Sequence, residues 1–138
     1  MRIDRTAVLV GAVVAFSLAM PVLVVFSIVD LVGYGIGCDS NWNVVFYLGL
    51  MVSMAIGGAA AARRRLREPL SHGALAALVA SAAIVVLRIV TNVSAGYGFT
   101  SRQCGVNLFA AGFTGITFST FFGLIGGYLA ERRTRPIP

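Results

Sequence analysis

The sequence has little charge and no lysine. Only 12% of its 138 residues are charged and 58% are hydrophobic, whereas roughly 25% of residues are charged in a typical water-soluble domain. A chain with so few charged side chains cannot cover a folded surface with polar groups, so the composition excludes a soluble globular domain and indicates a membrane protein. All 11 basic residues are arginine, a usage typical of GC-rich genomes.

Residues that carry enzyme chemistry are also scarce. His72 is the only histidine and is expected in a basic loop, so a histidine-based metal site is excluded. The two cysteines, Cys38 and Cys104, do not form the Cys-x-x-Cys pair of redox enzymes. No Gly-rich phosphate loop precedes a helix, and no apolar run holds the pair of carboxylates that a proton pump needs. We therefore expect a non-enzymatic protein with no cofactor and no metal.

Four long apolar runs alternate with polar segments. We predict one transmembrane domain over residues 1–138, with spans at residues 7–32, 44–62, 71–93 and 107–130. Runs of this length suit a ~30 Å hydrocarbon core, which takes about 20 helical residues. Pro21 should kink the first span. A basic start before an apolar run also resembles a signal peptide, but no cleavage site followed by a polar sequence is present, so we expect the first span to be retained.

The arginines gather on one side of these spans. Nine of them lie before the first span, between the second and third, or after the fourth: Arg2, Arg5, Arg63, Arg64, Arg65, Arg67, Arg132, Arg133 and Arg135. The positive-inside rule then predicts cytoplasmic termini and extracytoplasmic cysteine loops, in the plasma membrane of a prokaryote. The net charge of +6 is thus explained by topology, and we expect the lipid bilayer, not nucleic acid, as the partner.

The chain contains an internal repeat with a spacing of 66 residues. The matched pairs are Cys38 and Cys104, Asn41 and Asn107, Gly49 and Gly115, Ser53 and Ser119, and Gly57 and Gly123, with Ala61 opposite Gly127. The halves cover residues 1–68 and 69–138. We predict an all-α, integral membrane four-helix bundle made of two tandem helical hairpins, which a parallel repeat relates by an axis along the membrane normal.

The repeat makes two further predictions. Cys38 and Cys104 would lie near the axis on the oxidising side of the membrane, so we predict a disulfide between them, with two reduced cysteines as the alternative. Small residues recur every fourth position in both halves, at Gly49, Ser53 and Gly57 and at Gly115, Ser119, Gly123 and Gly127. This spacing allows close helix packing in lipid. The alternative is a lumen or substrate path lined by these residues.

Two charged residues in the spans are not duplicated by the repeat. Arg88 lies about 22 Å along the third span from Gly73, at 1.5 Å per residue. A buried arginine costs at least ~2.5 kcal/mol in a bilayer, so such a charge usually pairs or faces a cavity. Asp30 lies at a similar depth, and we predict an Asp30–Arg88 ion pair. Snorkelling of Arg88 to the outer interface and an anion or ligand site are the alternatives.

The fourth span holds the polar segment Thr117-Phe118-Ser119-Thr120-Phe121. This segment resembles the Thr-Phe-Ser-Thr-Phe stretch of the small dual-topology fluoride channels, whose chains also have four spans. The resemblance implies a channel with Phe118, Ser119, Thr120 and Phe121 on the pore side. In that family the stretch belongs to the third span, and the first span carries an arginine motif that this chain lacks.

These features leave two functional classes. The first is a non-enzymatic membrane protein that acts as a subunit or accessory of a larger assembly or as a homo-oligomer. It rests on the lack of catalytic residues and on more small-residue faces than one bundle core uses. The alternative is a small anion channel or transporter, in which Arg88 and the polar fourth span form the pathway.

Overall fold

Four long helices make up nearly all of the chain that the structure describes. The computed structural model describes residues 3–31, 41–64, 68–96, 98–99 and 107–134. The helices are α1 (Arg5–Leu31), α2 (Asn41–Arg64), α3 (Pro69–Ser94) and α4 (Leu108–Thr134). Each is long and apolar enough to cross a membrane, with a mean hydropathy between 1.7 and 2.7 over its most apolar 18-residue window. The predicted all-α class, with four helices long and apolar enough to span a membrane, is confirmed for the described residues.

Local side-chain chemistry accounts for several helix ends. The Asp4 Oδ1 atom accepts hydrogen bonds from the N–H groups of Thr6 and Ala7 at 3.0 and 3.4 Å, which caps the start of α1. The Asn107 Oδ1 atom accepts one from the Phe109 N–H at 2.9 Å and caps α4 in the same way. Helix α3 ends at Ser94, and Gly96, two residues later, has a φ of +83° that suits glycine. Helix α1 continues through Pro21.

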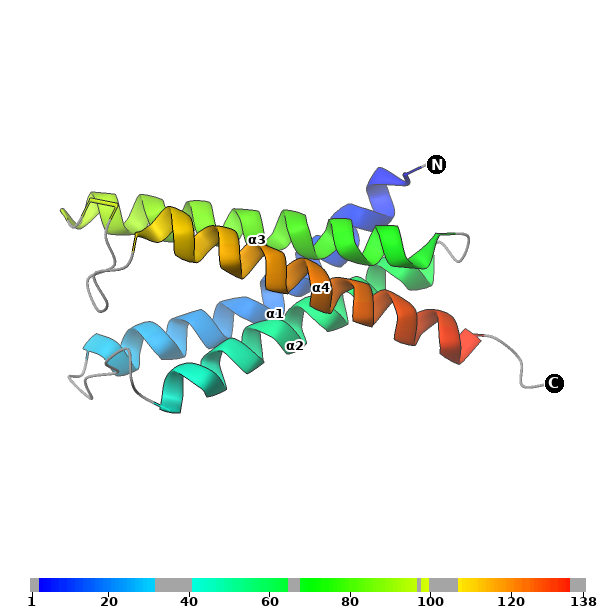
Figure 1. The fold of residues 1–138 in the computed structure, drawn as a ribbon, viewed down its shortest axis with the longest axis horizontal. Helices are drawn as coiled ribbons and strands as arrows, with labels where there is room; N and C mark the ends of the chain where they lie inside the picture. The colour runs from blue at the N-terminus through cyan, green and yellow to red at the C-terminus, as the bar shows by residue number, and fades with distance from the viewer. Residues whose placement is uncertain (1–2, 32–40, 65–67, 97, 100–106, 135–138) are drawn as a thin grey trace.

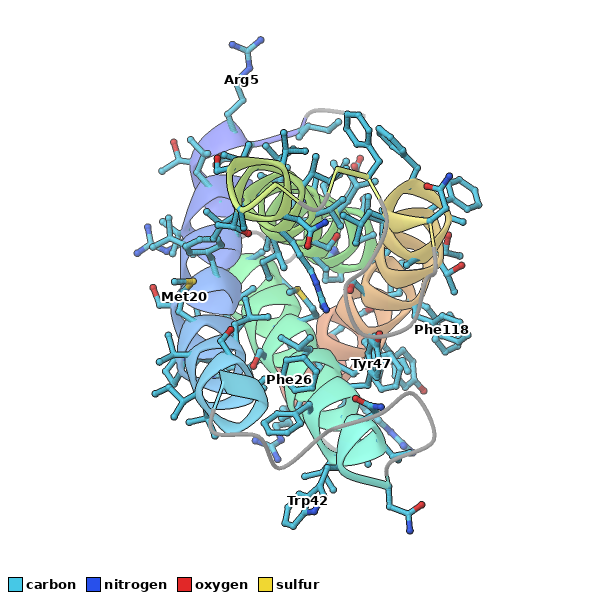
Figure 2. The ribbon with its side chains drawn as sticks, turned by 90° about the vertical axis from the view of Figure 1, so that its left-hand side faces the viewer. Arg5, Met20, Phe26, Trp42, Tyr47 and Phe118 are labelled. Carbon is cyan, nitrogen blue, oxygen red and sulfur yellow. The ribbon has the colours of Figure 1, made fainter. Side chains whose placement is uncertain are left out.

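The helices are arranged in the order α1, α2, α4, α3 around the bundle. Helix α1 contacts α2 and α3, α4 contacts the same two helices, and α2 contacts α3 across the centre, whereas the described parts of α1 and α4 do not touch. Figure 2 shows this order, with α1 and α4 on opposite sides. In Figure 1, α1 begins and α4 ends at the same end of the bundle, and the two hairpins diverge toward the other end.

This order differs from the expected axis along the membrane normal. Such an axis would exchange α1 with α3 and α2 with α4, so the contact between α2 and α3 would have to recur between α4 and α1. The described parts of α1 and α4 do not touch. The physical reason lies in adjacent glycines of α2. A Cβ atom at Gly57 would meet α1, at Ala15, and one at Gly58 would meet α4, at Gly123. Helix α2 therefore packs closely against two neighbours at once. The internal repeat stays a prediction.

Close backbone contacts occur at corresponding positions of the two hairpins. A Cβ atom added at Gly57 would contact the Ala15 side chain and lie 2.6 Å from the Gly11 carbonyl oxygen. One added at Gly123 would contact the Ala77 side chain and lie 2.5 Å from the Gly73 carbonyl oxygen. A side chain at either glycine would force its hairpin apart, so both hairpins depend on a bare backbone at this level.

His72 lies within α3, and its expected place in a basic loop is wrong. Pro69 begins α3 because its missing N–H and fixed φ suit the first turn of a helix, which puts His72 one turn inside. The ring is only 2% exposed. Its Nε2 atom accepts a hydrogen bond from the Asp4 N–H at 3.0 Å, so Nδ1 carries the proton and donates to the Glu68 carbonyl oxygen at 2.7 Å. The ring therefore ties the start of α1 to the start of α3.

Candidate functional site

A cavity of about 260 Å³ lies between the two hairpins, in the half of the bundle where they diverge. All four helices contribute to its wall, including Phe26 of α1, Tyr47 of α2, Arg88 of α3 and Ser119 of α4. In Figure 2, which looks at the bundle from this end, Phe26 lies between the helices, whereas Trp42 and Phe118 point outward. Tyr47 lines the cavity and is also exposed at the surface. This cavity is the candidate site.

The cavity exists because the small residues of α4 have different surroundings along the helix. A Cβ atom at Gly123 would contact α3, but one at Gly115, two turns earlier, would find no atom within 4 Å. Gly115 and Ser119 both line the cavity. In the repeat-equivalent helix, Gly49 faces Val22, and the buried Ser53 hydroxyl donates to the Gly49 carbonyl oxygen at 2.8 Å. The regular spacing of small residues thus produces close packing in one half of α4 and an open space in the other.

Arg88 supplies the cation of the cavity. Its guanidinium carbon lies 5.8 Å from the centroid of the Phe26 ring, within the range of a cation–π interaction. Arg88 precedes the last residue of α3 by six positions, which places it about 9 Å from that helix end at 1.5 Å per residue. Asp30 belongs to α1, but the structure does not describe its side chain, so the Asp30–Arg88 ion pair stays a prediction.

The wall of the cavity changes from polar to apolar with depth. Arg88, Asn43 and Tyr47 lie toward the diverging ends of the hairpins. Ser81 lies seven residues before Arg88, about 10 Å further into the bundle. Its hydroxyl donates to the Leu78 carbonyl oxygen at 3.1 Å. Between these levels the lining residues are apolar, including Leu50, Met51, Ile84 and Val85. One end of the cavity can hold an anion, and the rest suits a hydrocarbon.

The five residues of the fourth-span segment do not converge on this cavity. Ser119 lines it and is 5% exposed, whereas Thr117, Phe118 and Phe121 are exposed on α4. The Thr117 hydroxyl donates to the Phe113 carbonyl oxygen at 2.9 Å, and the half-buried Thr120 hydroxyl donates to the Ile116 carbonyl oxygen at 2.8 Å. Both threonines therefore satisfy their hydroxyls within α4.

Two further predictions from the sequence concern a disulfide and metal binding, and neither involves the residues that line the cavity. Cys38 and Cys104 lie outside the described residues, and their disulfide stays a prediction. In the part of the chain that the structure describes, no group of three or more His, Cys, Asp or Glu residues is placed to hold a metal ion. Phe26, Tyr47 and Ser81 line the cavity without a sequence signal, because each is an ordinary residue for a membrane span.

Comparison with protein-family models, with curated proteins and with solved structures finds no match to this chain. Its functional interpretation therefore rests on the chemistry of its own residues and on the geometry of the cavity.

Proposed function

We propose that this chain is a non-enzymatic protein of a prokaryotic plasma membrane, acting as a subunit or accessory of a larger membrane assembly or as a homo-oligomer. The observation that carries this proposal is the bonding of the hydroxyl groups in the spans. The side chains of Ser53, Thr114, Thr117 and Thr120 each donate to a carbonyl oxygen one turn earlier in the same helix. A hydroxyl group bonded in this way has already used its one donor within its own helix, so it has no proton to donate to a substrate or to a catalytic neighbour.

The exposed side of α4 is the surface that best suits a partner helix. Phe113 is 75% exposed, and Phe109, Phe118 and Phe121 are also exposed on this helix. Aromatic side chains favour edge-to-face and offset contacts with one another, which adds directional attraction to simple packing in lipid. At about 100° per residue, Phe109, Phe113 and Phe121 fall within about 120° of one another around α4, whereas Phe118 lies opposite Phe109. We define the α4 aromatic face as Phe109, Phe113 and Phe121, and propose it as the association surface.

Native mass spectrometry in mild detergent tests the association. We expect a reproducible complex, either of several copies of the chain or with a second membrane protein. Phe113→Ala should weaken the complex, whereas Val86→Ala, at an exposed position of α3, should not. A monomer without any stoichiometric partner would contradict the proposal. Equal weakening by both substitutions would move the association surface away from α4.

An anion channel or transporter is the second candidate, favoured by the position of Arg88 in the cavity. A path through a single chain would also have to cross the other half of the bundle. There Gly58 packs against Gly123, and Gly126 packs against Ala55, so the helices are in backbone contact. Transport would require these contacts to open. Anion flux into liposomes that is lost in Arg88→Leu, with folding intact, would favour this candidate, and wild-type liposomes without flux would exclude it.

A further inference from the structure

We propose that the cavity between the hairpins binds one anionic amphiphile with a single acyl chain, such as a medium-chain fatty-acid carboxylate. The carboxylate lies at Arg88, and the chain extends past Leu50 and Ile84 toward Met54 and Ser119. This inference goes beyond the proposed function, because neither association through α4 nor membrane insertion requires a ligand.

The charge of Arg88 selects the head group. A guanidinium presents paired N–H donors that match the two oxygens of a carboxylate, and it keeps its charge at any physiological pH. The ring of Phe26, 5.8 Å from the guanidinium carbon, holds this group from α1. The described side chains that line the cavity include no Asp or Glu, so the predicted Asp30–Arg88 pair is the one interaction that the ligand would have to displace. Arg88 is exposed on α3 and also lines the cavity. A bound carboxylate would pair its charge within a helix long and apolar enough to span the membrane.

The volume of the cavity and its apolar wall indicate that the remainder of the ligand is a single hydrocarbon chain. Its volume of about 260 Å³ is below the ~300–1,000 Å³ of pockets for drug-sized ligands, which suits one slender chain. Leu50, Met51, Ile84 and Val85 line the depth between Arg88 and the inner end. Met51 and Met54 have flexible side chains that adapt to a mobile hydrocarbon. An inorganic anion would occupy only the space beside Arg88 and leave this wall without a partner.

Binding is tested with the full chain in phosphatidylcholine nanodiscs. Decanoate, the uncharged decanol and a cationic decyl ammonium are titrated and followed by native mass spectrometry and calorimetry. We expect one decanoate per chain, with decanol weaker by about ten- to a hundredfold, the value of a hydrogen bond to a charged group. The cationic compound should not compete. Equal binding of decanoate and decanol would overturn the role of Arg88.

Two substitutions separate the head group from the chain. Arg88→Gln should reduce decanoate binding to the level of decanol and leave decanol unchanged. Gly115→Leu should weaken both ligands, because its side chain enters the open space at Gly115 without meeting another helix. Ala110→Leu, at an exposed position of the same helix, is the matched control and should bind like the wild type.

The folded state of each variant is checked by helical content and thermal midpoint, so loss of binding can be assigned to the site. Unchanged decanoate binding in Gly115→Leu would overturn the proposal, as would binding of decanoate in Arg88→Gln at wild-type affinity. Displacement of decanoate by phosphate, with Gly115→Leu behaving like the wild type, would indicate an inorganic anion site and would also overturn it. Association and ligand binding have separate readouts, so either can fail alone.

A photoreactive chain tests the orientation. With a diazirine at the terminal carbon of decanoate, we expect labelled peptides around Met54 and Ser119. With the diazirine next to the carboxylate, labelling should move to the peptide that contains Arg88. Labelling in the reverse order would overturn the proposed orientation.

Discussion

At the scale of single residues, the buried ring of His72 shows how one side chain joins two helices that are far apart in sequence. The Asp4 N–H can only donate, so it determines which ring nitrogen of His72 accepts and which carries the proton. The other nitrogen then bonds to the Glu68 carbonyl oxygen, one of the groups at the start of α3. A proline beside several arginines favours a loop at His72, but proline is also favoured in the first turn of a helix, which is where Pro69 lies.

Replacing His72 by alanine should therefore lower the free energy of unfolding by about 2–4 kcal/mol. Two hydrogen bonds are lost at ~1 kcal/mol each, and a buried donor and a small cavity are left behind. Unfolding by denaturant in detergent micelles measures the change. Leu70→Ala, two residues earlier and exposed, is the control and should cost much less. Equal losses for the two variants would show that the His72 hydrogen bonds do not stabilise the fold.

At the scale of the secondary-structure element, the regularly spaced small residues of α4 have two kinds of surroundings: some pack against a neighbouring helix and others border the cavity. Gly123 and Gly127 lie against α3 at backbone distance, whereas Gly115 borders the cavity. The spacing of four residues predicts the same packing for all of these glycines. It indicates which residues share a helix face, but it does not indicate how far away the next helix lies. The divergence of the hairpins, visible in Figure 1, makes the difference.

The two glycines should respond to alanine in opposite directions. Gly115→Ala should raise the free energy of unfolding by up to about 1 kcal/mol, because alanine favours a helix and the added methyl group meets nothing. Gly123→Ala should lower it by about 1–3 kcal/mol, because the methyl group would be forced against Ala77 and the Gly73 carbonyl oxygen. The same micelle unfolding assay compares the two. A loss of stability in Gly115→Ala would mean that the space at Gly115 is closed, and a gain in Gly123→Ala would mean that α3 and α4 are not in backbone contact there.

At the scale of the whole molecule, the distribution of arginine predicts how the bundle lies in the membrane. Arg5 starts α1, Arg63 and Arg64 end α2, and Arg132 and Arg133 end α4. The chain order of the helices brings these ends to the same side of the bundle. The cavity opens in the opposite half, which the positive-inside rule assigns to the extracytoplasmic leaflet. An amphiphile would then enter the site from that leaflet.

Reporter fusions measure this orientation. Green fluorescent protein at the C-terminus should fluoresce, whereas alkaline phosphatase at the same position should be inactive, because we expect this end to be cytoplasmic. A phosphatase domain inserted after Gly98 should be active. Equal activity of both reporters at the C-terminus would indicate dual topology, as in the fluoride channels that the fourth span resembles, and would contradict the prediction.

The predicted disulfide is tested by mass spectrometry of the protein purified without reductant. We expect Cys38 and Cys104 to resist alkylation until a reductant is added, after which both should be modified. Modification of both before reduction would show that they are free thiols. The loops that carry them would then lack the covalent link that the repeat and the oxidising side of the membrane predict.

The sequence by itself determined that this protein is helical, with four segments long and apolar enough to cross a membrane, because charge and hydropathy act locally along each segment. It also indicated that Arg88 faces a partner or a cavity, since a lone charge in hydrocarbon is costly. Only the tertiary structure decided the order of the helices and the place of the cavity. Both depend on how closely Gly57, Gly58 and Gly123 let neighbouring backbones approach, and on where the hairpins diverge. Such distances arise between helices and have no signature within any one of them.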